Sequence, residues 1–472
     1  MENRNQELMK NTIVLGIGQI VPKIIALFVL PLLTTYLTKE DYGLYELTLS
    51  VASFCIPLLS VQIQQGVFRF LLDSNKEKET IIVTSFYFVL FMYAVAAWPI
   101  IVGWNLYTHD IILGIIFFLG YMAEMLLNWL GQVARGIGYN IVYSLAYVIY
   151  SVLFIFMLLL FVEIQRLNVK SVIFSMIIAY GVSFGFIWIK LNIEDYFKKT
   201  QWNLSWLKEL LRYSAPMVIS SISLWIVNLS DRFFVSAFLG IQMTAVYSVA
   251  NKIPNLFNSV YNIFNLAWTE NTSKLTAEEK QGQYYSNFFE VFFNAIVGLM
   301  IALITVSPAL FKFLISSKYA ESYGLMSWLY VGVFLSSLVA FLGSIYVGEK
   351  KTRNVGISSA IGSIMNVIIN LIFMKRFGVI VAALSTIISY LIICVYRAID
   401  IKKYIHIIYK PFTIICGVTI VCVVAAINYE FSIKTTIISA IVTIIYNFYF
   451  NRFIIKKIIF SIVNKKNVDK IE

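Results

Sequence analysis

Long apolar runs dominate this sequence. About fourteen stretches of roughly 20 residues or more carry few charges, a length that lets an α-helix cross the hydrocarbon core of a bilayer. The chain is 60% hydrophobic and 13% charged, with a mean hydropathy of +0.80, whereas soluble proteins have about 25% charged residues. Only helices and closed barrels satisfy their backbone hydrogen bonds in lipid. The sequence therefore predicts an all-α, polytopic membrane protein with about 14 transmembrane helices.

The expected spans are separated by short connections. They cover residues 11–37, 42–70, 81–105, 111–135, 140–162, 171–190, 214–239, 244–269, 284–306, 322–348, 354–374, 378–400, 411–428 and 433–451. The longest connections are too short to hold a soluble domain. Residues 194–213 mix Trp and Leu with Lys and Glu, which predicts an amphipathic helix at the membrane surface.

The distribution of positive charge predicts the orientation. The net charge of +12 comes from Lys and Arg in short loops between apolar spans, which indicates membrane orientation and no nucleic-acid partner. If the N-terminus is cytoplasmic, the internal loops hold roughly three times as many cations as the external ones. We expect a multi-pass protein of the cell membrane with both termini in the cytoplasm.

Polar side chains recur at helical intervals in two neighbouring spans. The eighth span carries a polar stripe with a spacing of three or four residues, made by Asn251, Asn255, Asn258, Asn262, Asn265 and Thr269. The seventh span carries Asn228, Asp231 and Arg232. Amides and charges are costly in lipid unless they face protein or water. We expect these helices to line a wet cavity.

The second span repeats the same spacing from Glu46 to Gln64, about 200 residues before the asparagine stripe. Two diverged copies of one unit would explain this, as would two unrelated helices that each bear a polar stripe. The first interpretation gives an N-terminal six-helix bundle (1–193), an amphipathic connector (194–213), a C-terminal six-helix bundle (214–405) and two accessory helices with a basic tail (406–472).

Ionisable residues within the spans are functional candidates. We expect Lys23, Arg232 and Lys252 to line the cavity, the alternative being a structural ion pair such as Asp231 with a neighbouring cation. Arg69 and Arg135 lie near span ends, where they could instead reach the headgroups. The candidate cavity residues are Lys23, Arg69, Arg135, Asn228, Arg232, Asn251, Lys252, Asn255, Asn258 and Asn262.

Four acids within the spans, Glu46, Glu124, Asp231 and Glu290, could bind a coupling ion such as H⁺ or Na⁺ or neutralise nearby cations. Neither a nucleophile elbow, nor an HExxH motif, nor a phosphate-binding P-loop occurs in the sequence. All four cysteines lie in apolar runs, which argues against a disulfide framework or a zinc site. We expect a transporter, not an enzyme, with no cofactor and no metal.

Several short motifs resemble the bacterial polysaccharide transporter family, the O-antigen flippases of the Wzx type. They are GQIVP at residues 18–22, YLTKEDYGLY at 36–45, VFRF at 67–70, ARG at 134–136 and AVYSVANK at 245–252. The likeness extends over essentially the whole chain, although each motif is short. The same superfamily holds multidrug and toxin extruders and lipid II flippases.

This resemblance implies two six-helix bundles in a V around a central cavity, plus a terminal helix pair, that alternate between inward-open and outward-open states. The implied cargo is an oligosaccharide joined through pyrophosphate to undecaprenol and moved to the outer leaflet, with a polysaccharide polymerase as a possible partner. Asparagine amides suit sugar hydroxyls, and Lys23, Arg232 and Lys252 suit the pyrophosphate.

Other functions stay open. A multidrug exporter or a lipid II flippase of the same superfamily would share the fold, and Asp231 and Glu46 would suit organic cations. A membrane polysaccharide polymerase would be expected to have a large external loop, whereas every external loop expected here is short. A scaffold protein would need no sealed polar cavity.

Overall fold

The computed structural model describes residues 2–73, 77–164, 167–274, 281–349, 351–430 and 432–452. The expected basic tail after residue 452 and most of the connection before residue 281 lie outside these ranges. Throughout the described ranges the regular structure is helical, which confirms the predicted all-α class. The chain divides into two compact units, residues 1–225 and 226–472.

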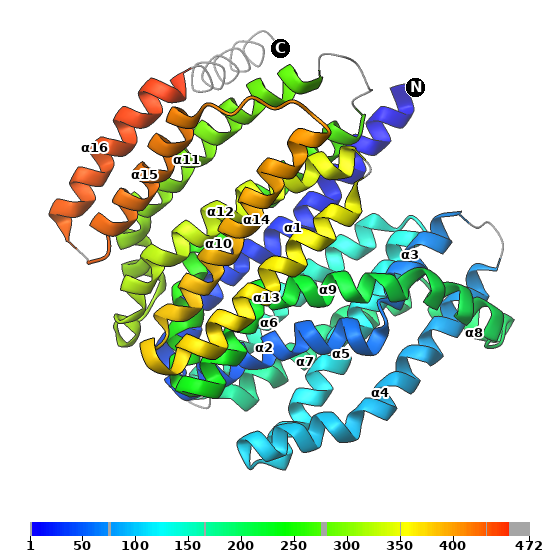
Figure 1. Ribbon diagram of the computed structural model, residues 1–472. Helices are drawn as coiled ribbons and strands as arrows, with labels where there is room; N and C mark the ends of the chain where they lie inside the picture. The colour runs from blue at the N-terminus through cyan, green and yellow to red at the C-terminus, as the bar shows by residue number, and fades with distance from the viewer. Residues whose placement is uncertain are drawn as a thin grey trace, which may run out of the picture. The chain divides into compact units, whose positions relative to one another are not determined.

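Unit 1 contains eight helices and the first part of a ninth. They are α1 (Glu2–Tyr36), α2 (Lys39–Ser60), α3 (Ile63–Asp73), α4 (Lys78–Thr108), α5 (Ile111–Gly136), α6 (Asn140–Glu163), α7 (Val169–Lys190), α8 (Ile193–Lys199) and α9 (Leu204–Leu239). Helix α6 packs between α1 and α7, and α5 packs against α3, α4 and α7 (Figure 1).

Unit 2 contains the rest of α9 and the following helices. They are α10 (Ile241–Lys274), α11 (Gln281–Leu314), the 3₁₀ turn η1 (Ser317–Tyr319), α12 (Ser322–Gly348), α13 (Thr352–Phe377), α14 (Ile380–Asp400), the 3₁₀ turn η2 (Ile401–Lys403), α15 (Pro411–Ile427) and α16 (Ile433–Phe450). Helix α12 packs against α10 and α14, α13 packs against α14, and α15 and α16 cover α11.

Helices cover the expected spans, with a break inside one of them, although not every helix is equally apolar. Within the described ranges ten helices are long and apolar enough to cross a membrane, or eleven if the bent α9 forms one span. Two shorter apolar helices cover Ile20–Tyr36 and Pro411–Ile427. Helix α10 is not among the ten, and it is the helix that carries the asparagine stripe.

The expected span 42–70 is broken in the middle. Val61 and Gln62 adopt left-handed backbone angles, with φ of 49° and 54°, and separate α2 from α3. This conformation costs about 1–2 kcal/mol for each non-glycine residue. The Gln62 amide offsets part of that cost, because its Nε2 donates to Ser221 Oγ at 2.8 Å and its backbone N–H donates to Ser60 Oγ at 3.1 Å.

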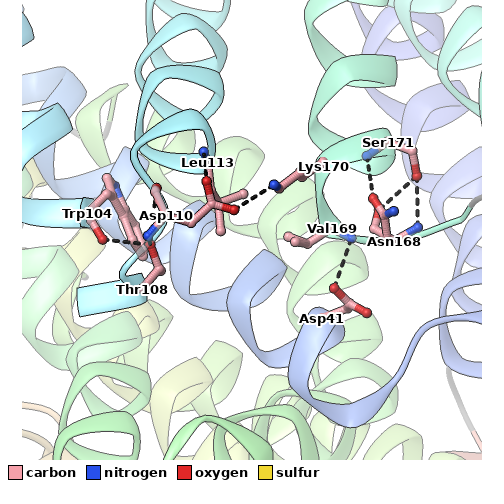
Figure 2. Close-up of polar contacts among 9 residues, drawn as sticks. All are labelled: Asp41, Trp104, Thr108, Asp110, Leu113, Asn168, Val169, Lys170 and Ser171. Carbon is pink, nitrogen blue, oxygen red and sulfur yellow. Dashed lines mark hydrogen bonds and ion pairs between the residues drawn. The ribbon is translucent and has the colours of Figure 1, made fainter. Parts of the chain in front are cut away.

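Helix caps join α2, α5 and α7 at one end of unit 1 (Figure 2). Asp110 caps α5 by accepting from Leu113 N at 3.0 Å, and Lys170 of α7 contacts the same carboxylate at 2.5 Å. Asp41 of α2 accepts from Val169 N at 3.1 Å, at the first residue of α7. Carboxylates are favoured at helix N-termini, so these contacts fix the three helix ends together.

Candidate functional site

A buried carboxylate lies at the centre of the polar interior of unit 2. Asp231, on α9, is 2% exposed. Tyr247 OH and Thr386 Oγ1 donate to its Oδ2 at 2.9 and 2.7 Å, and Asn370 Nδ2 donates to its Oδ1 at 2.8 Å. Asn366 Nδ2 and Ser385 Oγ lie farther from Oδ1, at 3.4 and 3.5 Å. Helices α10, α13 and α14 thus all direct uncharged donors at one carboxylate.

The cation next to Asp231 in the sequence points elsewhere. Arg232 donates through Nε to Ser248 Oγ of α10 at 3.0 Å. Neighbouring residues on a helix project about 100° apart, so Asp231 and Arg232 face different partners. Hydroxyl and amide groups of neighbouring helices thus satisfy the buried Asp231 carboxylate as hydrogen-bond donors.

The asparagine stripe of α10 is divided between an interhelical contact and exposed positions. Asn258 Oδ1 accepts from Ser336 Oγ of α12 at 3.3 Å, and Asn265 Oδ1 accepts from Ser344 Oγ of α12 at 3.2 Å. Asn255 and Asn262 are exposed. Asn251 is half-buried and donates to Tyr247 O of its own helix at 2.9 Å. The exposed amides are those available to a polar ligand.

Two further candidates in unit 2 lie beside these groups. Asn228 is exposed, and its Oδ1 accepts from Tyr390 OH of α14 at 2.7 Å. Lys252 is half-buried on α10. Glu290 lies on α11 and forms an ion pair with Lys410, with 2.7 Å between Oε2 and Nζ. Glu290 is therefore balanced by a cation 120 positions along the chain.

The candidates of unit 1 occupy different environments. Lys23 and Arg69 are exposed on α1 and α3, whereas Glu46 of α2 is only 2% exposed. Arg135, near the end of α5, places its guanidinium over the rings of Phe68 and Tyr143, at 4.6 and 5.4 Å from their centroids. Such cation–π contacts stabilise a cation that is partly removed from water.

Glu124, half-buried on α5, lies among tyrosines from five helices. Its carboxylate interacts electrostatically with Tyr45, Tyr93, Tyr121, Tyr147, Tyr150 and Tyr180. These residues belong to α2, α4, α5, α6 and α7.

Sequence reasoning missed a buried cation in unit 2. Arg397 of α14 is 3% exposed, and its guanidinium donates to the backbone oxygens of Val339 and Val355 at 2.7 and 3.2 Å. It also donates to the hydroxyls of Ser358 and Ser359 at 2.9 and 3.0 Å. The available signal was the group of serines Ser358, Ser359 and Ser363 in the eleventh expected span, since hydroxyls that face a neighbouring helix can accept from a buried cation.

Comparison with known proteins identifies the family. Residues 8–269, more than half of the chain, match the family described as "Polysaccharide biosynthesis protein". No curated protein sequence matches the chain. Among solved structures, the lipid II flippase MurJ in an inward closed conformation is 15% identical, with a TM-score of 0.70 over 95% of this chain and 100% of MurJ.

Two other similar structures are transporters of the MOP superfamily. An inward-facing multidrug resistance MATE family transporter has a TM-score of 0.61 at 15% identity, covering 81% of this chain and 98% of that one. A MOP superfamily transporter from Pyrococcus furiosus, described by the reverse polarity of its binding pocket, has a TM-score of 0.55 at 16% identity, covering 84% of this chain and 95% of that one. The chain therefore belongs to the polysaccharide biosynthesis protein family, and it has the all-helical fold of the MurJ and MATE transporters.

Proposed function

We propose that this protein is a flippase that moves a lipid-linked oligosaccharide, joined to undecaprenol through pyrophosphate, from the inner to the outer leaflet of the cell membrane. The match to the polysaccharide biosynthesis family is the observation that carries the proposal. Transport of this cargo would supply subunits for a capsule, an O-antigen or another surface polysaccharide, and a polymerase in the outer leaflet would be the partner that consumes it.

The polar groups of α10 suit the sugar part of such a cargo. Asn255 and Asn262 are exposed, seven residues apart and hence on one face of the helix. Asn262 offers two donors and an acceptor, and Asn255, whose Oδ1 accepts from Asn258 Nδ2 at 3.0 Å, offers two donors; these groups match the hydroxyls of a sugar. Lys23, Arg232 and Lys252 are the candidates for binding the pyrophosphate, because cations form the strongest hydrogen bonds to phosphate oxygens.

Complementation of a strain that lacks its own flippase, by this protein and its variants, tests the proposal. Asn255→Leu with Asn262→Leu should fail to restore surface polysaccharide and should leave lipid-linked oligosaccharide in the inner leaflet, at normal expression. Val260→Leu is the matched control, because Val260 is exposed on the opposite face of the same helix. Full complementation by the double variant would contradict the assignment, and export of organic cations without any effect on the oligosaccharide would favour a multidrug exporter.

The Asp231 cluster is our candidate for the coupling cation, H⁺ or Na⁺. Alternating binding of a cation there could couple transport to an ion gradient, since α9, α10, α13 and α14 all contribute to the cluster. In proteoliposomes, Asp231→Asn should abolish stimulation of transport by a proton or sodium gradient. Ser236→Ala, at another buried polar position of α9, is the control. Equal stimulation of Asp231→Asn and the wild type would remove Asp231 from this role.

The orientation rests on the excess of positive charge in alternate loops. We propose that both termini and the loop around Lys351 face the cytoplasm. In a background without native cysteines, Lys351→Cys should react with a membrane-impermeant thiol reagent only after the cells are permeabilised, because Lys351 is exposed and, in the proposed orientation, faces the cytoplasm. Reaction in intact cells would reverse the orientation.

A further inference from the structure

A pocket of about 450 Å³ opens at the start of α11 in unit 2. Its walls come from the first three turns of α11, from the connector between α14 and α15, and from the first turn of α15. In Figure 1 this connector is the orange segment that leaves α14 and reaches α15. The volume is that of a small-molecule site. The residues that line the pocket include none from the Asp231 cluster or the asparagine stripe.

Close backbone packing at Gly282 forms the inner wall. A Cβ atom at this position would lie 2.6 Å from His406 O, so only glycine allows α11 to approach the connector this closely. Ser286, one turn later, accepts from Ile408 N at 2.9 Å and thereby fixes the connector. Ile405 and Ile407 are buried, whereas His406 and Ile408 are exposed and belong to the lining of the pocket.

The rim of the pocket is polar. Lys410 and His406 line it beside Glu290, whereas Lys403 of the same segment pairs with Asp400. Lys410 lines the pocket as the N-cap residue of α15, which has no side-chain cap, and α11 also begins there without an acid in its first turn. Helix N-termini attract anions. His406, Gln283 and Asn287 add side-chain N–H donors.

One acid limits where an anion can bind. Glu290 contacts Lys410 through both oxygens, at 2.7 and 2.8 Å from Nζ. An ammonium group has three donors, and this pair holds Lys410 at the pocket with donor capacity left on the side away from Glu290. An anion would therefore lie between Lys410 and His406, away from the carboxylate.

The floor of the pocket is apolar. Phe289, Phe293 and Ile414 line it, and the apolar runs of α11 and α15 both begin at this level. A ligand that fits would place a charged group at the rim and hydrocarbon along α11 and α15. That combination is the chemistry of a phospholipid, and basic pockets between membrane helices bind phospholipid headgroups.

We propose that this pocket binds the phosphodiester headgroup of an anionic membrane phospholipid, with Lys410 and His406 as the donors to its phosphate. The bound lipid would join the start of α11 to the connector and to α15. This inference does not depend on the cargo of the transporter.

Lipid-dependent thermal unfolding of the purified full-length protein tests this site. Phosphatidylglycerol added to the detergent-solubilised protein should raise the Tm, whereas phosphatidylcholine should not. Each lysine near an anionic headgroup contributes about 1 kcal/mol, so Lys410→Gln should weaken the apparent affinity for phosphatidylglycerol about fivefold. The double variant with His406→Gln should weaken it further. Lys434→Gln, which removes an exposed lysine at the start of α16, should bind like the wild type.

Three further measurements make the test decisive. Asn287→Asp adds a negative charge at an exposed rim position without removing any packing, so it should also weaken binding even if the Lys410 variants fold poorly. Native mass spectrometry should detect phosphatidylglycerol retained by the wild type and lost from Asn287→Asp. Inorganic phosphate at millimolar concentration should leave the Tm unchanged. Unchanged phosphatidylglycerol binding in Asn287→Asp and Lys410→Gln would overturn the site, and full stabilisation by inorganic phosphate would overturn a lipid as its ligand.

Discussion

Two asparagines of the same α10 stripe should differ in their effect on stability. Asn265 Oδ1 accepts from Tyr261 OH and from Ser344 Oγ of α12, both at 3.2 Å. Asn262, three residues earlier, is exposed. Leucine branches at the same position as asparagine but is larger, and it cannot accept a hydrogen bond. Asn265→Leu therefore removes two bonds, one of them between helices, whereas Asn262→Leu removes a group that faces away from its helix neighbours.

The magnitude follows from hydrogen bonds measured in other membrane proteins. Each averages about 0.6 kcal/mol, so Asn265→Leu should lower the free energy of unfolding by roughly 1.2 kcal/mol. In a unit of about this size, 1 kcal/mol shifts the Tm by about 2–4 °C, which predicts a fall of roughly 2–5 °C. Asn262→Leu should change the Tm by less than about 2 °C.

Thermal unfolding of the two purified variants in one detergent, with tryptophan fluorescence as the readout, measures the difference directly. Transport should respond in the opposite order, since we propose that Asn262 contacts the cargo. If Asn262→Leu proved as destabilising as Asn265→Leu, the division of the stripe into interhelical and exposed amides would be refuted.

Three other changes have expected outcomes. Asp110→Ala should destabilise the protein more than Asp110→Asn, because asparagine keeps the cap on Leu113 N and loses only the pair with Lys170, worth about 0.2–1 kcal/mol. The Lys170 ammonium and the Leu113 N–H lower the pKa of Asp110 from 3.8. The stabilisation that the Asp110 carboxylate provides should therefore be complete above about pH 4 and disappear as the pH falls through the folded-state pKa. Urea unfolding at pH 7 and pH 3 checks this sign. Arg397→Met should cost at least roughly 1.5–3 kcal/mol, the value of one hydrogen bond to a charged group, and should lower the Tm in detergent. Gly282→Ala should displace the connector from α11, and proteolysis of the connector should then become faster than in the wild type.

The sequence predicted the helical class and the place of nearly every span, because a run of about 20 apolar residues has few alternatives in a membrane. It did not predict the break at Val61 and Gln62. Neither residue is a turn former, and β-branched valine is among the residues that least favour the left-handed region. The Gln62–Ser221 hydrogen bond that accompanies the break joins positions 159 apart, so no local pattern could indicate it.

The sequence identified polar positions within the spans but not the partners of those positions. Asp231 was singled out as an intramembrane acid, and Arg232 was the obvious counter-charge because it is adjacent in the sequence. In the folded protein the contacts of Asp231 come instead from Asn370 and Thr386, about 140 and 155 positions away. Adjacent residues of a helix diverge in direction, whereas helix packing determines which distant residues converge. The periodicity thus predicts which face is polar, and the identity of the group opposite it depends on tertiary structure.

Arg397 shows why proximity to a span end does not decide the environment of a cation. It lies one turn before the end of α14, where a long side chain would normally reach the interface. Its guanidinium is instead buried against backbone oxygens of α12 and α13, while Asp400, three residues later, takes Lys403, Tyr346 and Asn354 as partners. A buried cation is tolerated when enough acceptors surround it, and helix carbonyls near Ser358 and Ser359 provide them without any acid. Counting acids and bases along a sequence cannot reveal such a site, because its counterpart is the backbone.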